Sequence, residues 1–173
     1  MASGEIAIPT FRWVLAQSDI TVLALVTQPD KPVGRHQVLT ASPLKEMAIA
    51  AGIAVLQPES IRKSRVIDEI VALRPDVMVV MAYGQLLTER LLSGARLACW
   101  NLHASLLPKY RGAACIQAAI DSGDRESGIT VMHVAKALDA GDIVLQCPIP
   151  LKQQETGGSL HDCLADLAAV ALA

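Results

Sequence analysis

The sequence predicts an α/β fold: a Rossmann-like, open, mainly parallel sheet with helices on both faces. Short, continuous apolar runs alternate with segments of helical periodicity along the chain. Continuous apolar runs are typical of strands that are buried on both faces of a parallel sheet. The 173 residues are 52% hydrophobic and 18% charged, which excludes a disordered chain and suits a single domain with a substantial core.

The first predicted helix lies close to the start of the chain. Ile8, Phe11, Val14 and Leu15 recur at helical spacing. Gly4 stands just before this helix, where a glycine normally follows a strand, but only Met1 to Ser3 precede it. We therefore expect that the strand which should open the fold is missing, or that another strand takes its place.

The next segments predict a strand, a loop and a helix. Residues 20–27 form an apolar run typical of a fully buried strand, and the prolines and glycine of residues 28–37 indicate a loop. Residues 42–51 follow as a helix, with Ser42 as its N-cap and Pro43 at its first position.

The middle of the chain continues the alternation of strands and helices. A short strand is predicted over 53–58, an amphipathic helix over 61–73, and the most apolar strand over 76–84. A helical stretch over 86–94 then leads to a strand over 97–103. Ligands of such sheets bind beyond the carboxyl ends of the strands, so residues at these ends are the first candidates for a site.

The last third of the chain predicts two strands between two helices. A helix is expected over 113–122, and strands are expected over 127–134 and 143–150. Ser159, with Asp162 three residues later, resembles a capping box that starts the final helix.

Asn101 and His103 form the strongest candidate site. They are two residues apart at the end of a predicted strand, and alternate residues of a strand face the same side. An amide and an imidazole held together can polarise a carbonyl and transfer a proton. A catalytic histidine also needs a carboxylate to orient it, and Asp139 is the first candidate and Asp142 the second. The alternatives are a solvated loop histidine and aspartates that only stabilise a turn.

Other chemistries are poorly supported. Ser105 lacks a GxSxG motif, Cys115 lies inside a predicted helix, and the histidines lack the spacing of metal ligands. No GxGxxG or P-loop motif occurs. The four cysteines form no CxxC pair, and the chain shows neither a signal peptide nor an apolar run long enough to span a membrane, so we expect a cytoplasmic protein with reduced thiols.

The net charge of −2 argues against broad electrostatic capture of nucleic acid. A nucleic-acid partner would need a local basic patch. Lys31, Arg35 and Lys45 could contribute to such a patch, although basic residues in a loop are more often simply solvated.

Several motifs resemble the formyltransferases that use 10-formyltetrahydrofolate. They are Asn101-x-His103, SLLPKYRGAA from Ser105, and LDAGD from Leu138. Three further segments, at residues 26–35, 76–84 and 113–117, narrow the resemblance to the catalytic domain of the methionyl-tRNA formyltransferases. The glycinamide ribonucleotide formyltransferases share the motif around His103 but not the TQPDKPxGR loop. The motifs stand in the family's order over almost the whole chain.

The resemblance implies a catalytic set of Asn101, His103 and Asp139. The α-amine of methionine on initiator tRNA would attack the formyl carbon of the folate. Asn101 and protonated His103 would stabilise the oxyanion, and Asp139 would support His103 and help to relay the proton. Thr130 stands where the family has a small hydroxyl residue near the site.

The resemblance also implies binding residues. The co-substrate would be 10-formyltetrahydrofolate with no metal, and its pocket would include Met81, Tyr83, Gly84, Gln85, Leu86, Ser105, Leu106, Leu107 and Pro108. Arg35, with Lys31, would reach toward the acceptor stem of the tRNA. We expect a monomer.

The chain departs from the family pattern in ways that keep two alternatives open. We expect a single catalytic domain over residues 1–173 that lacks the family's first strand and its C-terminal domain, so that it binds tRNA weakly. Cys115 replaces a proline that is usual in the family, and Trp100 replaces a smaller residue. The alternatives are formyl transfer to a small amine, either glycinamide ribonucleotide or an amino sugar, and a truncated domain that binds folate without turnover.

Overall fold

The structure, a computed structural model, describes residues 1–173 apart from the side chain of Val33. Its helices are η1 (Glu5–Ala7), α1 (Ile8–Ala16), α2 (Pro43–Ala50), α3 (Ser64–Ala72), α4 (Glu89–Leu92), α5 (Cys115–Asp121) and α6 (Gly157–Leu172). Its strands are β1 (Ala24–Val26), β2 (Lys31–Val33), β3 (Val38–Thr40), β4 (Ala54–Leu56), β5 (Val77–Val80), β6 (Ala98–His103), β7 (Glu126–His133) and β8 (Ile143–Pro150).

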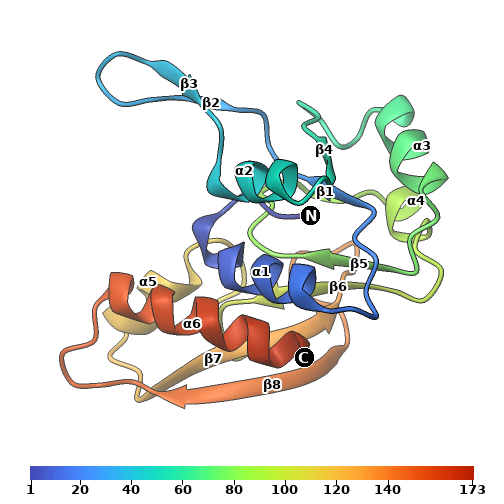
Figure 1. Cartoon of the computed structure of the whole chain (residues 1–173). Helices are drawn as coiled ribbons and strands as arrows, with labels where there is room; N and C mark the ends of the chain where they lie inside the picture. The colour runs from blue at the N-terminus through green and yellow to red at the C-terminus, as the bar shows by residue number, and fades with distance from the viewer.

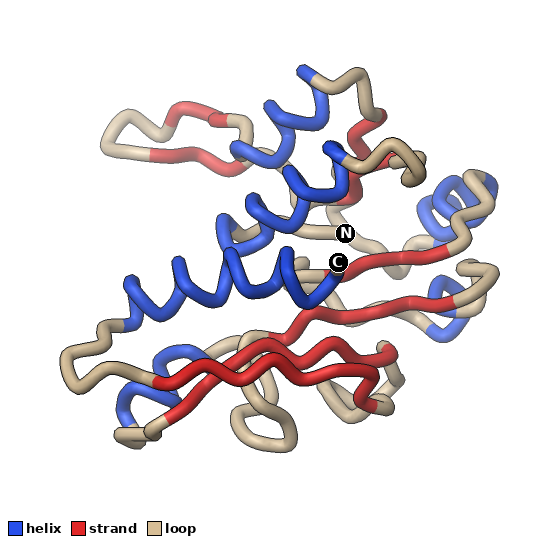
Figure 2. The backbone as a smooth tube through the Cα atoms, turned by 60° about the horizontal axis from the view of Figure 1, so that its bottom comes forward, coloured by secondary structure: helices blue, strands red, loops and turns tan.

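The main sheet has the strand order β5-β6-β7-β8, and Figure 2 shows its strands side by side in red. β5 and β6 are parallel, whereas β6 with β7 and β7 with β8 are antiparallel. A second parallel pair, β1 with β4, lies beyond β5. The predicted α/β class is confirmed, and the structure adds that the C-terminal part of the sheet is antiparallel.

The first two residues join the β1–β4 pair to the main sheet. The Ala2 amide donates to the Val26 carbonyl at 3.0 Å, and the Met81 amide donates to the Met1 carbonyl at 3.0 Å. Ala2 and Met81 form a parallel bridge. Met1 and Ala2 therefore occupy the place between β1 and β5 where we expected the opening strand to be missing or replaced.

The strand predicted over 20–27 is shorter than expected and is not fully buried. It is hydrogen-bonded as β1 only over Ala24–Val26, because its partner β4 is equally short. Ile20 and Leu23 are each 41% exposed. An apolar run forms a buried strand only where a neighbouring strand or helix covers it.

Helices cover both faces of the sheet, as predicted, and each face has its own core. Residues that alternate along a strand enter different cores: Leu25 packs with α1 and α6, whereas the next residue, Val26, packs with α3 and α4. Figure 1 shows α1 and α6 side by side on one face, with α3 and α4 at the other end of the molecule. This alternation is the period of two that strands impose on a buried sheet.

Two local predictions are corrected by the structure. The proline- and glycine-rich segment forms the antiparallel hairpin β2–β3, with Lys31 paired to Thr40, and not a simple loop. Figure 1 shows this hairpin projecting away from the body of the molecule. The final helix is capped by Thr156 rather than Ser159, because Gly157 and Gly158 are themselves helical.

The other helix start that was predicted from its cap is confirmed. Ser42 caps α2 and accepts a hydrogen bond from the Lys45 amide at 3.3 Å, with Pro43 in the first turn. The helices in the part of the chain that the structure describes include none with the length and apolarity needed to cross a membrane.

Candidate active site

β6 carries Asn101 and His103 at the centre of the main sheet. It lies between β5, where Val80 pairs with Asn101, and β7, where Thr130 pairs with His103. Leu102, between the two polar residues, packs into the core with α1 and α6. Asn101 and His103 therefore face the opposite side, as the alternation of a strand requires. The side chain of His103 is only 8% exposed.

Asp139 reaches the same place from the turn between β7 and β8. Asp139 has a left-handed backbone, with φ 45°. At Gly141 an added Cβ would lie 1.8 Å from the His133 carbonyl oxygen, so only glycine allows this turn to pass so close to β7. The His133 amide donates to the Asp142 carbonyl at 2.9 Å and closes the turn.

The carboxylate of Asp139 brings the predicted residues together. Its Oδ1 accepts a long hydrogen bond from Asn101 Nδ2 at 3.4 Å, and its Oδ2 accepts from the Gly112 amide at 2.8 Å. Oδ2 also lies 3.6 Å from His103 Nδ1, which is within the range of an ion pair but too long for a hydrogen bond. Asp142, the second candidate, is exposed and contributes its backbone to the turn.

The two ring nitrogens of His103 face different groups. Its Nε2 lies 2.9 Å from the Tyr110 carbonyl oxygen and donates a hydrogen bond to it, since a carbonyl can only accept. Its Nδ1 faces Asp139. Both ring nitrogens thus face oxygen atoms, at hydrogen-bond distance for Nε2 and beyond it for Nδ1.

The loop after β6 is held against β7 by the hydroxyl of Thr130. Thr130 Oγ1 donates to the Ser105 carbonyl at 2.6 Å and accepts from the Leu107 amide at 3.1 Å. Ser105 Oγ donates in turn to the Lys109 carbonyl at 2.7 Å. Of the four loop residues that the resemblance assigns to folate, Ser105 and Leu107 are buried, Leu106 is half-buried, and Pro108 is exposed.

Residues 81–86 are the other expected part of the folate site. They follow β5 and leave the sheet at the same end of the strands as His103. This follows from the parallel pairing of Val80 with Asn101. Met81 and Tyr83 are each 2% exposed and lie in different cores, and burial raises the pKa of Tyr83 to about 12. These two residues can offer a ligand only their backbone.

The rest of that segment is more accessible. Gly84 and Leu86 are exposed. Gln85 is fixed through its side chain, because its Oε1 accepts from the Ile61 amide at 2.9 Å. Gln28 Nε2 donates to the Tyr83 carbonyl at 2.8 Å and thereby ties the end of β1 to this turn.

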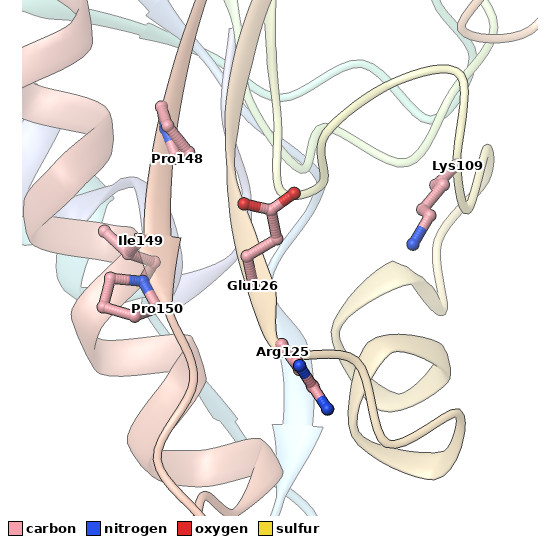
Figure 3. A pocket seen from close by; sticks show the side chains of 6 residues that line it. All are labelled: Lys109, Arg125, Glu126, Pro148, Ile149 and Pro150. Atoms are coloured by element: carbon pink, nitrogen blue, oxygen red, sulfur yellow. The ribbon is translucent and has the colours of Figure 1, made fainter.

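Two cavities flank the outer side of the loop. One, of about 290 Å³, is lined by Leu106, Pro108, Lys109, Tyr110, Asp124, Glu126, Ser127 and Gln146. The other, of about 570 Å³, is lined by Lys109, Arg125, Glu126, Pro148, Ile149 and Pro150. Figure 3 shows Lys109 on the loop, across this second cavity from the prolines of β8. Neither cavity is lined by Asn101, His103 or Asp139, so both lie beside the catalytic candidates rather than on them.

Sequence reasoning missed three groups that complete the site. The Gly112 amide and the Tyr110 carbonyl are backbone groups, which no side-chain pattern reveals. The third is Gln146, whose Nε2 donates to the Leu107 carbonyl at 2.9 Å. An amide within the otherwise apolar strand 143–150 was the available signal for it.

The two basic residues expected to contact tRNA lie on the projecting hairpin. Lys31 is in β2 and Arg35 is in the turn that follows, and both are exposed. Figure 1 shows that this hairpin projects away from the main sheet, whose strand β6 carries Asn101 and His103. Across the residues whose side chains are described, no three His, Cys, Asp or Glu side chains gather as a metal site requires.

Known proteins are similar to this chain over most of its length. Residues 13–173 match the family described as formyl transferase. The chain is 56% identical over 165 residues to a methionyl-tRNA formyltransferase of Akkermansia muciniphila, covering 95% of this chain and 52% of that protein. A methionyl-tRNA formyltransferase of Xylella fastidiosa is 45% identical, with 95% and 53% covered. The chain therefore spans about half the length of the curated relatives it matches.

Solved structures show the same fold. Glycinamide ribonucleotide transformylase 1 from Symbiobacterium toebii superposes with a TM-score of 0.81 at 21% identity, covering 99% of this chain and 81% of that one. Phosphoribosylglycinamide formyltransferase from Brucella melitensis gives a TM-score of 0.76 at 25% identity, covering 99% and 88%. With the family match over most of its length, the chain belongs to the formyl transferase family.

Proposed function

We propose that this chain transfers a formyl group from 10-formyltetrahydrofolate to the α-amine of methionyl-tRNA. The observation that supports it most is the contact of one carboxylate, that of Asp139, with Asn101, His103 and the Gly112 amide at the carboxyl end of β6. The relatives' names suggest the reaction and the acceptor.

In the proposed reaction, Asn101 and His103 act on the oxygen of the formyl group. Asn101 donates one amide hydrogen to Asp139. Its second amide hydrogen can be donated to the formyl oxygen as the amine attacks and negative charge develops there. Protonated His103 adds a positive charge beside it. Donors fixed before the reaction stabilise that charge at no cost in reorganisation.

Asp139 and His103 would also handle the proton of the reaction. The attacking amine gains a positive charge as its nitrogen–carbon bond forms, and it must lose a proton. The departing N10 of the folate must gain one as its bond to the formyl carbon breaks. The Asp139 carboxylate can take up the proton of the amine, and protonated His103 can give a proton to N10. Transfer of a proton from Asp139 to His103 then restores both groups, so formylated amine and tetrahydrofolate leave with no net change in protonation of the site.

The hairpin β2–β3 is the feature we assign to the tRNA acceptor. Lys31 and Arg35 are exposed on an element that projects from the body, where they can reach phosphates that a small amine lacks. The chain as a whole carries a net charge of −2, so we expect its electrostatic contact with tRNA to be confined to the hairpin β2–β3.

A competition assay tests both the reaction and the acceptor. The purified chain receives 10-formyltetrahydrofolate together with methionyl-tRNA, glycinamide ribonucleotide and an amino sugar, and the formylated products are separated. We expect formylmethionyl-tRNA to dominate, and Asn101→Ala to lower its rate by roughly 100-fold or more, as for loss of an oxyanion donor. Preferred formylation of a small amine would contradict the acceptor, and a folate-binding chain without any product would contradict the reaction.

A further inference from the structure

Gln146 occupies an unusual place on the edge strand β8. It is the one amide within Ile143–Pro150 and pairs across the sheet with Thr130, which is completely buried. Thr130 in turn pairs with His103 across β6 and β7. Gln146 therefore stands two strands away from His103 at the same level of the sheet.

The side-chain amide of Gln146 makes two hydrogen bonds that hold the loop after β6. Its Nε2 donates to the Leu107 carbonyl at 2.9 Å and to Thr130 Oγ1 at 3.0 Å. An amide nitrogen has two hydrogens, so one serves each acceptor. Thr130 Oγ1 then accepts from Gln146 and from the Leu107 amide and donates to the Ser105 carbonyl. The hydroxyl uses its donor and both of its lone pairs, and the network is complete.

The same loop ends on the imidazole of His103. From Ser105, the hydroxyl bond to the Lys109 carbonyl brings the chain around to Tyr110, whose carbonyl accepts from His103 Nε2 at 2.9 Å. A shift of Leu107 would therefore move the Tyr110 carbonyl and, with it, the ring of His103.

The loop after β6 also packs directly on the backbone of β7. A Cβ added at Gly128 would lie 2.7 Å from Leu106 Cδ2, so Leu106 rests directly against the backbone of β7. That added Cβ would also lie 2.2 Å from the Cys147 carbonyl oxygen. The loop is thus held by apolar contact on one side and by Gln146 and Thr130 on the other.

We propose that Gln146 is a positioning residue for formyl transfer, which orients His103 by fixing the Leu107 carbonyl and the Thr130 hydroxyl beneath the loop. This inference rests on the proposed function and adds a residue from an edge strand to the site. The role requires an amide, because only a neutral group with two N–H bonds can satisfy both acceptors. A carboxylate of the same shape has none to offer and places its charge beside the Leu107 carbonyl.

Gln146→Glu is the direct test, with Gln146→Met as a variant of similar length that adds no charge. Gln153→Glu, at another exposed glutamine, is the matched control for the added charge. In a formylation assay run well below the unfolding temperature, we expect both Gln146 variants to lower kcat by roughly tenfold to 100-fold, as for a misplaced catalytic group. The KM for the acceptor and the control variant should be unchanged.

A nitrogen-15 NMR spectrum of the histidine side chains supplies a readout independent of turnover. We expect the Nε2–H signal of His103, assigned by its loss in His103→Asn, to shift or broaden in Gln146→Glu and to stay in place in Gln153→Glu. A Gln146→Glu protein with a lower melting temperature but an unchanged kcat and an unchanged His103 signal would overturn the inference. If the wild-type chain transfers no formyl group, the proposed function fails, and the His103 signal alone decides whether Gln146 positions the ring.

Discussion

At the scale of single residues, the site depends on how Asp139 divides its contacts. One oxygen faces the Asn101 amide, and the other faces the Gly112 amide and the imidazole of His103. The side chain is 10% exposed, so water competes little for it and its effect on the neighbouring groups is strong. Removing this carboxylate should disturb both the Asn101 amide and the His103 imidazole. Removing the Asn101 side chain should remove only one hydrogen-bond donor from the site.

The residues of the site differ in how readily sequence could reveal them. Asn101, His103 and Asp139 are polar side chains at predicted strand ends, and a pattern can identify such residues. The Tyr110 carbonyl and the Gly112 amide cannot be read in this way, because any residue carries them and only the path of the loop brings them to His103 and Asp139. Met81 and Tyr83 show a second limit of sequence reasoning, since a position near a strand end does not reveal that a side chain turns into the core.

Cys99 gives a prediction on stability against pH. Burial raises the pKa of its thiol from 9.0 to about 11. Between these values the unfolded chain loses a proton that the folded chain keeps, so the unfolded state binds fewer protons and stability falls as pH rises. We expect a loss of at most about 2–3 kcal/mol from this group between pH 9 and 11.

Chemical unfolding at several pH values measures this loss. Comparison with Cys99→Ala isolates the thiol, since the variant lacks the group and should show a shallower fall over the same range. Cys163→Ala, which removes an exposed thiol, should follow the wild type. Equal slopes for the wild type and Cys99→Ala would show that Cys99 ionises as freely in the folded chain as in the unfolded one.

At the scale of elements, sequence predicted types better than lengths. The strand over 143–150 and the α2 helix agree with expectation because their boundaries are set locally, by turn residues and by the Ser42 cap. The strand over 20–27 is shorter because its length depends on a neighbour distant in sequence. The hairpin β2–β3 was missed because prolines and a glycine suggest a loop and do not exclude short pairing at an edge.

The hairpin gives a prediction that separates acceptor binding from chemistry. Replacing Lys31 and Arg35 together by alanine should raise the KM for methionyl-tRNA and leave the melting temperature unchanged, since both side chains are exposed. The dependence of binding on salt should fall by about two in the slope of log K against log salt, one for each lost phosphate contact.

Arg62→Ala with Arg65→Ala is the matched control, because it removes two exposed positive charges elsewhere. Its KM for tRNA and its salt dependence should match those of the wild type. If both double variants weaken tRNA binding equally, the effect comes from overall charge and the hairpin has no special role.

At the scale of the whole molecule, one sheet separates two cores, and the β1–β4 pair joins the rest through Met1 and Ala2. Leu164 of α6 and Ile67 of α3 are buried in opposite cores. We expect the two cores to unfold together. Leu164→Ala and Ile67→Ala should then each lower the free energy of unfolding of the whole chain by about 2–5 kcal/mol.

Urea unfolding, monitored by tryptophan fluorescence and by circular dichroism, tests whether the two cores unfold in one transition. The two signals should give the same midpoint in the wild type and in both variants. Val170→Ala, on the exposed face of α6 at 69% exposure, should change stability by no more than about 0.5 kcal/mol. Separate midpoints would mean that one side of the sheet unfolds without the other.

The central claim is that the carboxylate of Asp139 organises a formyl-transfer site, and Asp139→Asn tests it most directly. The change keeps the size of the side chain and removes its charge. Transfer of a labelled formyl group to methionyl-tRNA is measured in a single turnover, at a temperature where both proteins are folded. We predict a rate at least roughly 100-fold below that of the wild type. A folded Asp139→Asn protein that transfers the label at the wild-type rate would contradict the claim.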